Sequence, residues 1–145
     1  MKKILVLNGP NLNMTGIRSK DVYGAETLDS INAELAAYAR EKGAEVEFFQ
    51  SNSEGAIIDK IHLSMREYDG VVLNAGAYTH YSYAIRDAIE CVKDFTPFVE
   101  VHMSDIHARE DFRKKSVITE VCVAQICGLG KGSYKKGIDL LLQIL

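Results

Sequence analysis

Apolar positions along this chain follow two spacings, and segments with one spacing alternate with segments of the other from the N-terminus to the C-terminus. Short apolar runs are typical of strands that are covered on both faces in a parallel sheet. Between these runs, apolar residues return every three or four positions, which places them on one face of a helix. The predicted strands are residues 4–7, 46–50, 71–73, a segment that begins at Phe98, and 121–126.

The helix boundaries are marked as well. Thr27 is a typical N-cap residue, and Gly43 ends the helix that follows it. The predicted helical faces are Leu28, Ile31 and Leu35; Ile57, Ile58, Ile61 and Met65; Ala84, Ile85, Ala88 and Ile89; and Ile138, Leu141, Leu142 and Leu145. The segment 104–119 is long for a connection, and it is predicted to hold a short helix near 110–114.

This order of elements predicts the fold class. Five strands separated by helices imply right-handed crossovers, and therefore an α/β doubly wound parallel sheet with helices on both faces. A flavodoxin-like strand order in a three-layer α/β/α arrangement is the natural prediction for five strands. A length of 145 residues fits one domain that covers 1–145.

Composition narrows the class of protein further. The chain is 47% hydrophobic and 26% charged, with a net charge of −3 and a pI near 5.8, so it lacks the basic character of nucleic-acid-binding proteins. No apolar stretch approaches the ~18 residues of a membrane helix, and the opening run stops at Asn8, short of a signal peptide. We therefore expect a cytoplasmic protein. Cys91, Cys122 and Cys127 have no paired spacing and are predicted to be core side chains.

The strand that begins at Phe98 leads directly into chemically capable residues. Alternate side chains of a strand share a face, so Glu100 and His102 are expected to point the same way. A carboxylate beside an imidazole fixes its tautomer and makes it a general acid or base. Met103 and Ser104 then offer backbone N–H groups at the strand end, where open parallel sheets bind their ligands.

Other polar side chains are expected at the same edge, because the loops that follow parallel strands gather there. These residues are Asn8, Asn11, Asn13, Arg18 and Tyr23 after the first strand; Ser51, Asn52 and Glu54 after the second; Asn74, Gly76, Tyr78, Thr79, His80 and Ser82 after the third; and His102, Ser104, Asp105, His107, Arg109 and Arg113 after the fourth. Loops are polar in general, so it is the combination of His, Arg, Asn and Tyr that indicates a site.

Several kinds of site known for such sheets fit poorly. A flavin site needs a Ser/Thr-rich loop after the first strand, and a receiver domain needs an aspartate where the third strand ends at Asn74. The glycines of 128–132 come too late in the chain for a dinucleotide loop. His80, His102 and His107 lack the spacing of metal ligands. We predict neither a metal nor a cofactor.

Tyr23 and Arg18 form a second candidate pair. Tyrosine is a poor base at its reference pKa of about 10, but a guanidinium nearby stabilises the phenolate and lowers that pKa. Such a tyrosine removes a proton next to a carbonyl. From this pair alone, an ordinary exposed loop tyrosine is the better interpretation.

Taken together, these segments resemble the type II 3-dehydroquinate dehydratases, in family order and over nearly the whole chain. The matching segments are 8–13 (NGPNLN), 22–24 (VYG), 50–55 (QSNSEG), 74–80 (NAGAYTH), 86–88 (RDA), 99–104 (VEVHMS), 107–113 (HAREDFR) and 128–130 (GLG). The chain departs from the family at Arg18-Ser19-Lys20-Asp21, which lacks a proline, and at Asp105, where asparagine is common.

The resemblance implies dehydration of 3-dehydroquinate to 3-dehydroshikimate in the shikimate pathway, by anti elimination through an enolate. It implies that Tyr23 is the base, that Arg18 activates it, and that His102 is the general acid. It further implies that Glu100 orients His102 and that Asn11 helps to stabilise the enolate. A non-catalytic flavodoxin-like module that binds a small anion is the alternative hypothesis.

The resemblance also implies a set of substrate-binding residues: Asn74, Gly76, His80, Asp87, Met103, Ser104, Arg109 and Arg113. In this set, the backbone N–H groups of Met103 and Ser104 match the carboxylate site. Asp87 matches a position that reaches substrate from a neighbouring subunit. The implied assembly is a homo-oligomer, a dodecamer built from four trimers.

Overall fold

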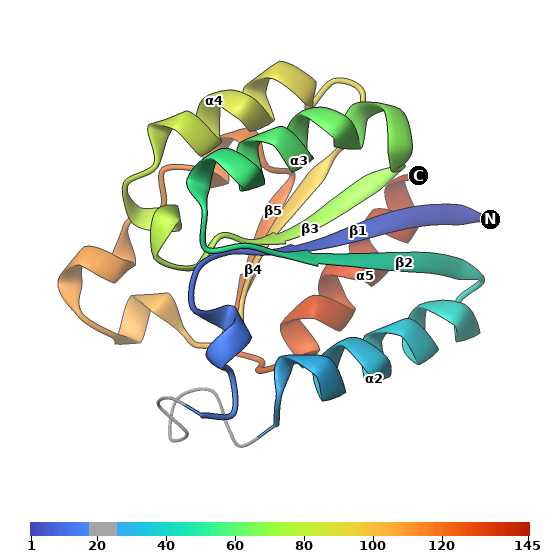
Figure 1. Cartoon of the computed structure of the whole chain (residues 1–145), viewed down its shortest axis with the longest axis horizontal. Coiled ribbons are helices and arrows are strands. Elements are labelled where there is room, and N and C mark those ends of the chain that lie inside the picture. Colours follow the sequence, from blue (N-terminus) through green and yellow to red (C-terminus); the bar gives the residue numbers. More distant parts are fainter. Residues whose placement is uncertain (18–25) are drawn as a thin grey trace.

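The protein is described by a computed structural model that covers residues 1–17 and 26–145. Five parallel strands form one sheet in the order β2-β1-β3-β4-β5 (Figure 1). The strands are β1 (Lys2–Asn8), β2 (Ala44–Gln50), β3 (Gly70–Asn74), β4 (Phe98–His102) and β5 (Ala124–Cys127). This order confirms the predicted flavodoxin-like, doubly wound α/β fold.

Helices cover both faces of the sheet (Figure 1). The helices are α2 (Leu28–Glu41), α3 (Glu54–Glu67), α4 (Tyr83–Val92) and α5 (Gly132–Ile144). The apolar residues of α3 and α4 pack with one side of the central strands, and those of α2 and α5 pack with the other. Thr27 caps α2 as predicted, because its hydroxyl accepts a hydrogen bond from the backbone N–H of Ser30 at 3.1 Å.

The central strands carry continuous apolar runs because both of their faces are covered. Leu5 and Leu7 of β1 belong to the core under α3 and α4, whereas Ile4 and Val6 belong to the core under α2 and α5. All four side chains are fully buried. Register follows from this alternation, since a slip by one residue would exchange the two cores.

Several predictions about burial and boundaries are wrong. The fifth strand begins at Ala124 rather than at residue 121, because Val121 ends a 3-10 turn whose N–H bonds back to the carbonyl of Ile118 at 3.1 Å. Met65 is 40% exposed, and Ser64 occupies the buried position on α3 instead. Cys91 and Ala84 are exposed on α4 rather than part of the core.

The long connection after β4 consists of short 3-10 helices: η3 (Ile106–Ala108), η4 (Asp111–Lys114) and η5 (Thr119–Val121). The second of these confirms the short helix predicted near 110–114. The first two of these, η3 and η4, lie at the carboxyl edge of the sheet, opposite the two chain termini (Figure 1), and the chain then returns to the amino end of β5, where the N–H of Val123 donates to the carbonyl of Phe98 at 2.8 Å. Within the described residues, no helix has the length and apolar character needed to cross a bilayer.

Candidate active site

A pocket with a volume of about 110 Å³ lies at the carboxyl edge of the sheet. The loops that follow β1, β3 and β4 supply its walls. Its lining residues are Pro10, Asn11, Leu12, Asn74, Gly76, Ala77, His80, His102, Met103, Ser104, Ile106, Arg109 and Arg113. The structure therefore brings most of the predicted site residues into one cavity.

The loops after β1 and β3 touch each other closely enough to require glycine. A Cβ on Gly9 would lie 2.5 Å from the carbonyl oxygen of Ala75, and one on Gly76 would lie 3.0 Å from that of Pro10. The N–H of Gly9 also donates to the carbonyl of Asn74 at 2.8 Å. Asn11 follows with a left-handed backbone, φ 67°, which asparagine tolerates better than most residues. These contacts fix one wall of the pocket.

A buried tyrosine joins the ends of β1 and β3 beneath this wall. The hydroxyl of Tyr134, on α5, donates to Asn8 Oδ1 at 2.6 Å and accepts from Asn74 Nδ2 at 2.9 Å. Asn74 Oδ1 accepts from the N–H of Gly76 at 3.1 Å. Because both ends of the Asn74 amide are engaged, its orientation in the pocket is fixed.

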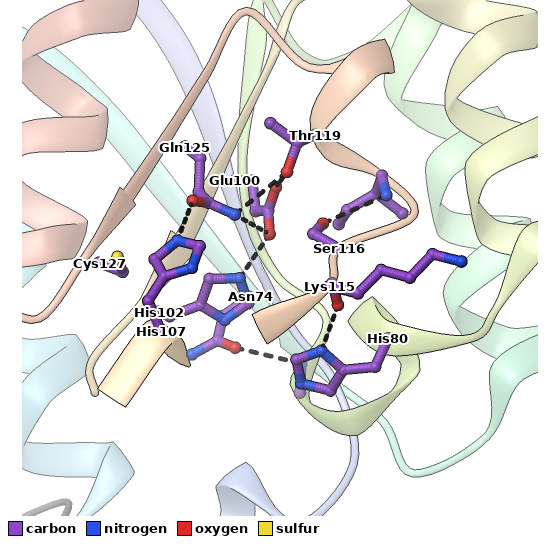
Figure 2. A network of polar contacts seen from close by, with 12 residues as sticks. Asn74, His80, Glu100, His102, His107, Lys115, Ser116, Thr119, Gln125 and Cys127 are labelled. Carbon is purple, nitrogen blue, oxygen red and sulfur yellow. Dashed lines mark hydrogen bonds and ion pairs between the residues drawn. The ribbon is translucent and has the colours of Figure 1, made fainter. Parts of the chain in front are cut away.

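The predicted pair on β4 is formed. His102 Nε2 lies 2.6 Å from Glu100 Oε2, and both side chains are buried (Figure 2). A carboxylate can only accept, so the imidazole donates through Nε2. The other ring nitrogen, Nδ1, is then the atom at which this imidazole exchanges its second proton.

Glu100 is ionised despite its burial. Burial raises the pKa of this carboxyl, but the hydrogen bond and charge of His102 lower it, together with hydrogen bonds from Thr119 and Gln125. The net result is a pKa below the usual range of a glutamate. The pair is therefore an anion that holds a histidine, the arrangement of a general acid or base.

The segment after β4 is held by the turn that precedes α5. The N–H of Gly128 donates to the Ser104 carbonyl at 3.0 Å, and that of Gly130 donates to the Met103 carbonyl at 2.9 Å. Both glycines have positive φ, 85° and 59°. The run Gly128-Leu129-Gly130 thus fixes the peptide planes at the strand end. Across the pocket mouth, Arg109 Nη1 donates to Ser104 Oγ at 3.3 Å.

His80 and Arg113 complete the opposite wall. His80 Nδ1 donates to the Lys115 carbonyl at 2.7 Å (Figure 2). Burial lowers the pKa of His80, and the charges of His102 and Arg113 lower it further. The hydrogen bond to Lys115 raises this pKa, but the net direction is downward. Arg113 pairs with Glu110, Nε to Oε2 at 3.0 Å. A neutral imidazole and a guanidinium suit a polyhydroxylated anion.

Some predicted site residues lie elsewhere. Asp87 is on α4 and does not line the pocket. Asp105 also stands outside the lining, and its Oδ1 accepts from the His107 N–H at 3.0 Å as the cap of η3. Arg18 and Tyr23 lie outside the described residues.

Three residues that sequence reasoning did not select belong to the hydrogen-bond network of the site: Thr119, Gln125 and Tyr134. Gln125 carried one usable signal, since it is a polar residue inside the predicted apolar strand 121–126. Tyr134 lies four residues before Ile138, one helical turn along the predicted face of α5. Nothing in the sequence marks Thr119.

Within residues 1–17 and 26–145, no three His, Cys, Asp or Glu side chains gather as metal ligands would. The prediction that the site needs neither a metal nor a cofactor stays a prediction.

The fold and the pocket define a doubly wound α/β protein with a buried carboxylate–histidine pair at its ligand-binding edge. The family model for class II dehydroquinases matches residues 2–142. The chain therefore belongs to the class II dehydroquinase family.

Individual relatives agree with this assignment. The 3-dehydroquinate dehydratase of Caldicellulosiruptor bescii is 54% identical over 146 residues, covering 100% of this chain and 99% of that protein. The type II dehydroquinase structure from Butyrivibrio crossotus has a TM-score of 0.95 at 50% identity and covers 97% of each chain. The one from Propionibacterium acnes has a TM-score of 0.94 at 40% identity, covering 99% of this chain and 97% of that chain.

Proposed function

We propose that this chain eliminates water from 3-dehydroquinate to give 3-dehydroshikimate, with His102 as the general acid. The observation that carries the proposal is the buried Glu100–His102 pair at the pocket. Family membership makes the chain a hydro-lyase of the shikimate pathway. The roles of individual residues, and residues 1–145 as one catalytic domain, belong to the proposal.

In the proposed acid step, protonated His102 transfers the proton on Nδ1 to the departing C1 hydroxyl, which leaves as water. Its Nε2–H remains hydrogen-bonded to Glu100, whose negative charge stabilises the imidazolium before the transfer. A hydroxide leaving group needs such a proton, and histidine is suited to supply it near neutral pH.

In the proposed base step, Tyr23 removes the C2 proton as a phenolate that Arg18 stabilises. The electrons of the broken C–H bond form an enolate, and they later expel the C1 hydroxyl. Asn11, which lines the pocket, helps to stabilise the enolate oxygen. Preorganised donors at a developing oxyanion are usually the largest single contribution to catalysis.

The proposed anchor for the substrate is its carboxylate, bound by the backbone N–H groups of Met103 and Ser104. Both residues line the pocket, beside Arg109. Asn74, Gly76, His80 and Arg113 then hold the ring hydroxyls. Hydrogen bonds in which the donor or the acceptor is ionised are about twice as strong as neutral ones, so the carboxylate end of the ligand sets its orientation.

Oligomeric state and location stay predictions. We propose a dodecamer, in which Asp87 reaches the site of a neighbouring subunit. This agrees with its position on α4, outside the pocket of its own chain. We also propose a cytoplasmic location.

The proposal is tested by ultraviolet absorbance after purified protein is mixed with 3-dehydroquinate. The product contains a conjugated enone carboxylate, which absorbs where the substrate does not. We expect a rise that neither a chelator nor borohydride treatment reduces, and that His102→Ala lowers by about 10²–10⁴-fold.

Two results would count against the proposal. A folded protein that binds 3-dehydroquinate without producing enone is the non-catalytic anion-binding module. Full activity of His102→Ala removes this residue from the proton transfer. Tyr23→Phe tests the base in the same assay, and there we expect no turnover from a folded protein.

A further inference from the structure

Glu100 has hydrogen-bond partners on the side away from the pocket. Thr119 donates through its hydroxyl to Glu100 Oε1 at 2.5 Å, and Gln125 donates through Nε2 to Glu100 Oε2 at 3.2 Å (Figure 2). Gln125 Nε2 also donates to Thr119 Oγ1 at 3.1 Å. Neither Thr119 nor Gln125 lines the pocket. The two residues therefore contact the carboxylate but not a ligand in the cavity.

The orientation of the Gln125 amide is determined by its surroundings. Its Oε1 lies 3.1 Å from His107 Nε2, in the connection after β4 (Figure 2). An amide oxygen only accepts, so His107 donates through Nε2. A flipped amide would turn its oxygen towards the Glu100 carboxylate, which is also an acceptor. The amide nitrogen therefore faces Glu100.

Three other titratable groups among the described residues, Cys122, Cys127 and His80, feel the charge of Glu100 but supply no positive charge to it. Burial raises the pKa of the Cys122 thiol, and the negative charge of Glu100 raises it further. Burial likewise raises the pKa of Cys127, with Asp105 and Glu100 adding to it. Burial lowers the pKa of His80, although the negative charge of Glu100 opposes this effect. The anion of Glu100 thus depends on His102, Thr119 and Gln125.

We propose that Thr119 and Gln125 are positioning residues for the general acid. They hold Glu100 as an anion with Oε2 directed at His102 Nε2, and so they keep Nδ1 of His102 as the proton-transferring atom. This inference rests on the proposed function, since it needs His102 to be the acid. It adds two residues that act through Glu100 and that were not among the predicted site residues.

Thr119 offers a matched pair of variants. Thr119→Val removes the hydroxyl at nearly constant volume, and Thr119→Ser keeps it. We expect Thr119→Val to lower kcat about 10-fold, the effect of losing one charge-assisted hydrogen bond. The KM should stay within about 2-fold of the parent value, because Thr119 does not line the pocket and so does not contact bound substrate. Thr119→Ser restores kcat.

The pH profile separates positioning from general destabilisation. With one donor fewer, the pKa of Glu100 rises, so the acid limb of kcat/KM moves to higher pH in Thr119→Val and stays in place in Thr119→Ser. Thr96→Val is the control, because Thr96 is a buried threonine in the connection between α4 and β4. It is expected to lower stability without moving kcat or the profile.

A measurement without turnover completes the test. The ring ¹⁵N shifts of His102 report its tautomer, and we expect the Nε2–H form in the parent protein and a larger Nδ1–H share in Gln125→Met. Gln125→Met also replaces Thr119→Val if that variant fails to fold. Equal kcat, pH profile and tautomer share in parent and variants would overturn the proposal. An inactive parent protein in which the variants still shift the tautomer overturns the proposed function alone.

Discussion

Tyr134→Phe tests whether the buried contact between α5 and the strand ends holds the pocket wall. The hydroxyl of Tyr134 is the only atom that this substitution removes. It bonds Asn8 Oδ1 at 2.6 Å and Asn74 Nδ2 at 2.9 Å. Tyr134 is 0% exposed, Asn8 1% and Asn74 4%, so water cannot readily replace the lost partner.

The expected magnitude follows from these two bonds. A buried polar group that loses its partner costs about 1–3 kcal/mol. Two such groups remain, so we expect the free energy of unfolding to fall by about 2–6 kcal/mol. Tyr38→Phe is the matched control, because Tyr38 bonds the Asp139 carboxylate at 2.7 Å in a part-buried setting. Water can solvate that carboxylate, and the expected loss is about 1 kcal/mol or less.

The assay is urea unfolding followed by far-ultraviolet circular dichroism, with all proteins at the same protomer concentration because assembly adds to apparent stability. Equal losses of stability in Tyr134→Phe and Tyr38→Phe would contradict this prediction, as would a midpoint of Tyr134→Phe that moves no more than that of a surface substitution. Substrate affinity gives a second reading. It should fall only in Tyr134→Phe, because only that variant frees the amide of Asn74.

Two further substitutions test the pocket in the same denaturation assay. Gly9→Ala places a Cβ 2.5 Å from the Ala75 carbonyl oxygen and should cost more than about 2 kcal/mol, whereas Gly55→Ala, whose Cβ meets only Ser53 Oγ at 3.9 Å in α3, should be neutral or stabilising. Glu100 has a folded-state pKa below its unfolded value of about 4.3, so its contribution is present above that pH and is lost as the pH falls through the folded pKa. The stability difference between the parent protein and Glu100→Gln should therefore shrink below about pH 4.3, and a constant difference down to pH 2 would contradict it.

The sequence predicted the fold because burial on both faces leaves a strong local signal. The residues of β1 and β3 are buried along almost their full length, and their apolar runs say so directly. The start of the fifth strand was predicted too early because Val121 is also buried. Val121 lies in a 3-10 turn and packs in the core under α3 and α4. Apolar character reports burial, and it does not distinguish a strand from a turn beneath a helix.

The site was predictable where one element sets the geometry. Glu100 and His102 are two apart on one strand, so their contact follows from strand alternation. Thr119, Gln125 and Tyr134 could not be found in this way. Each reaches its partner from another element, and the Tyr134–Asn8 bond spans 126 positions in the chain. Such contacts depend on how the layers pack, which local periodicity does not contain.

Burial of Glu100 distinguishes the two hypotheses for this pocket. A module that only binds a small anion needs backbone N–H groups and cations, and the negative charge of Glu100 behind His102 opposes the binding of an anion. A buried ion pair generally contributes less stability than apolar residues of similar volume. Here the fold surrounds a fully buried Glu100 with donors from Thr119, Gln125 and His102. Because stability alone does not favour that arrangement, its position at the pocket is best explained by proton transfer through His102.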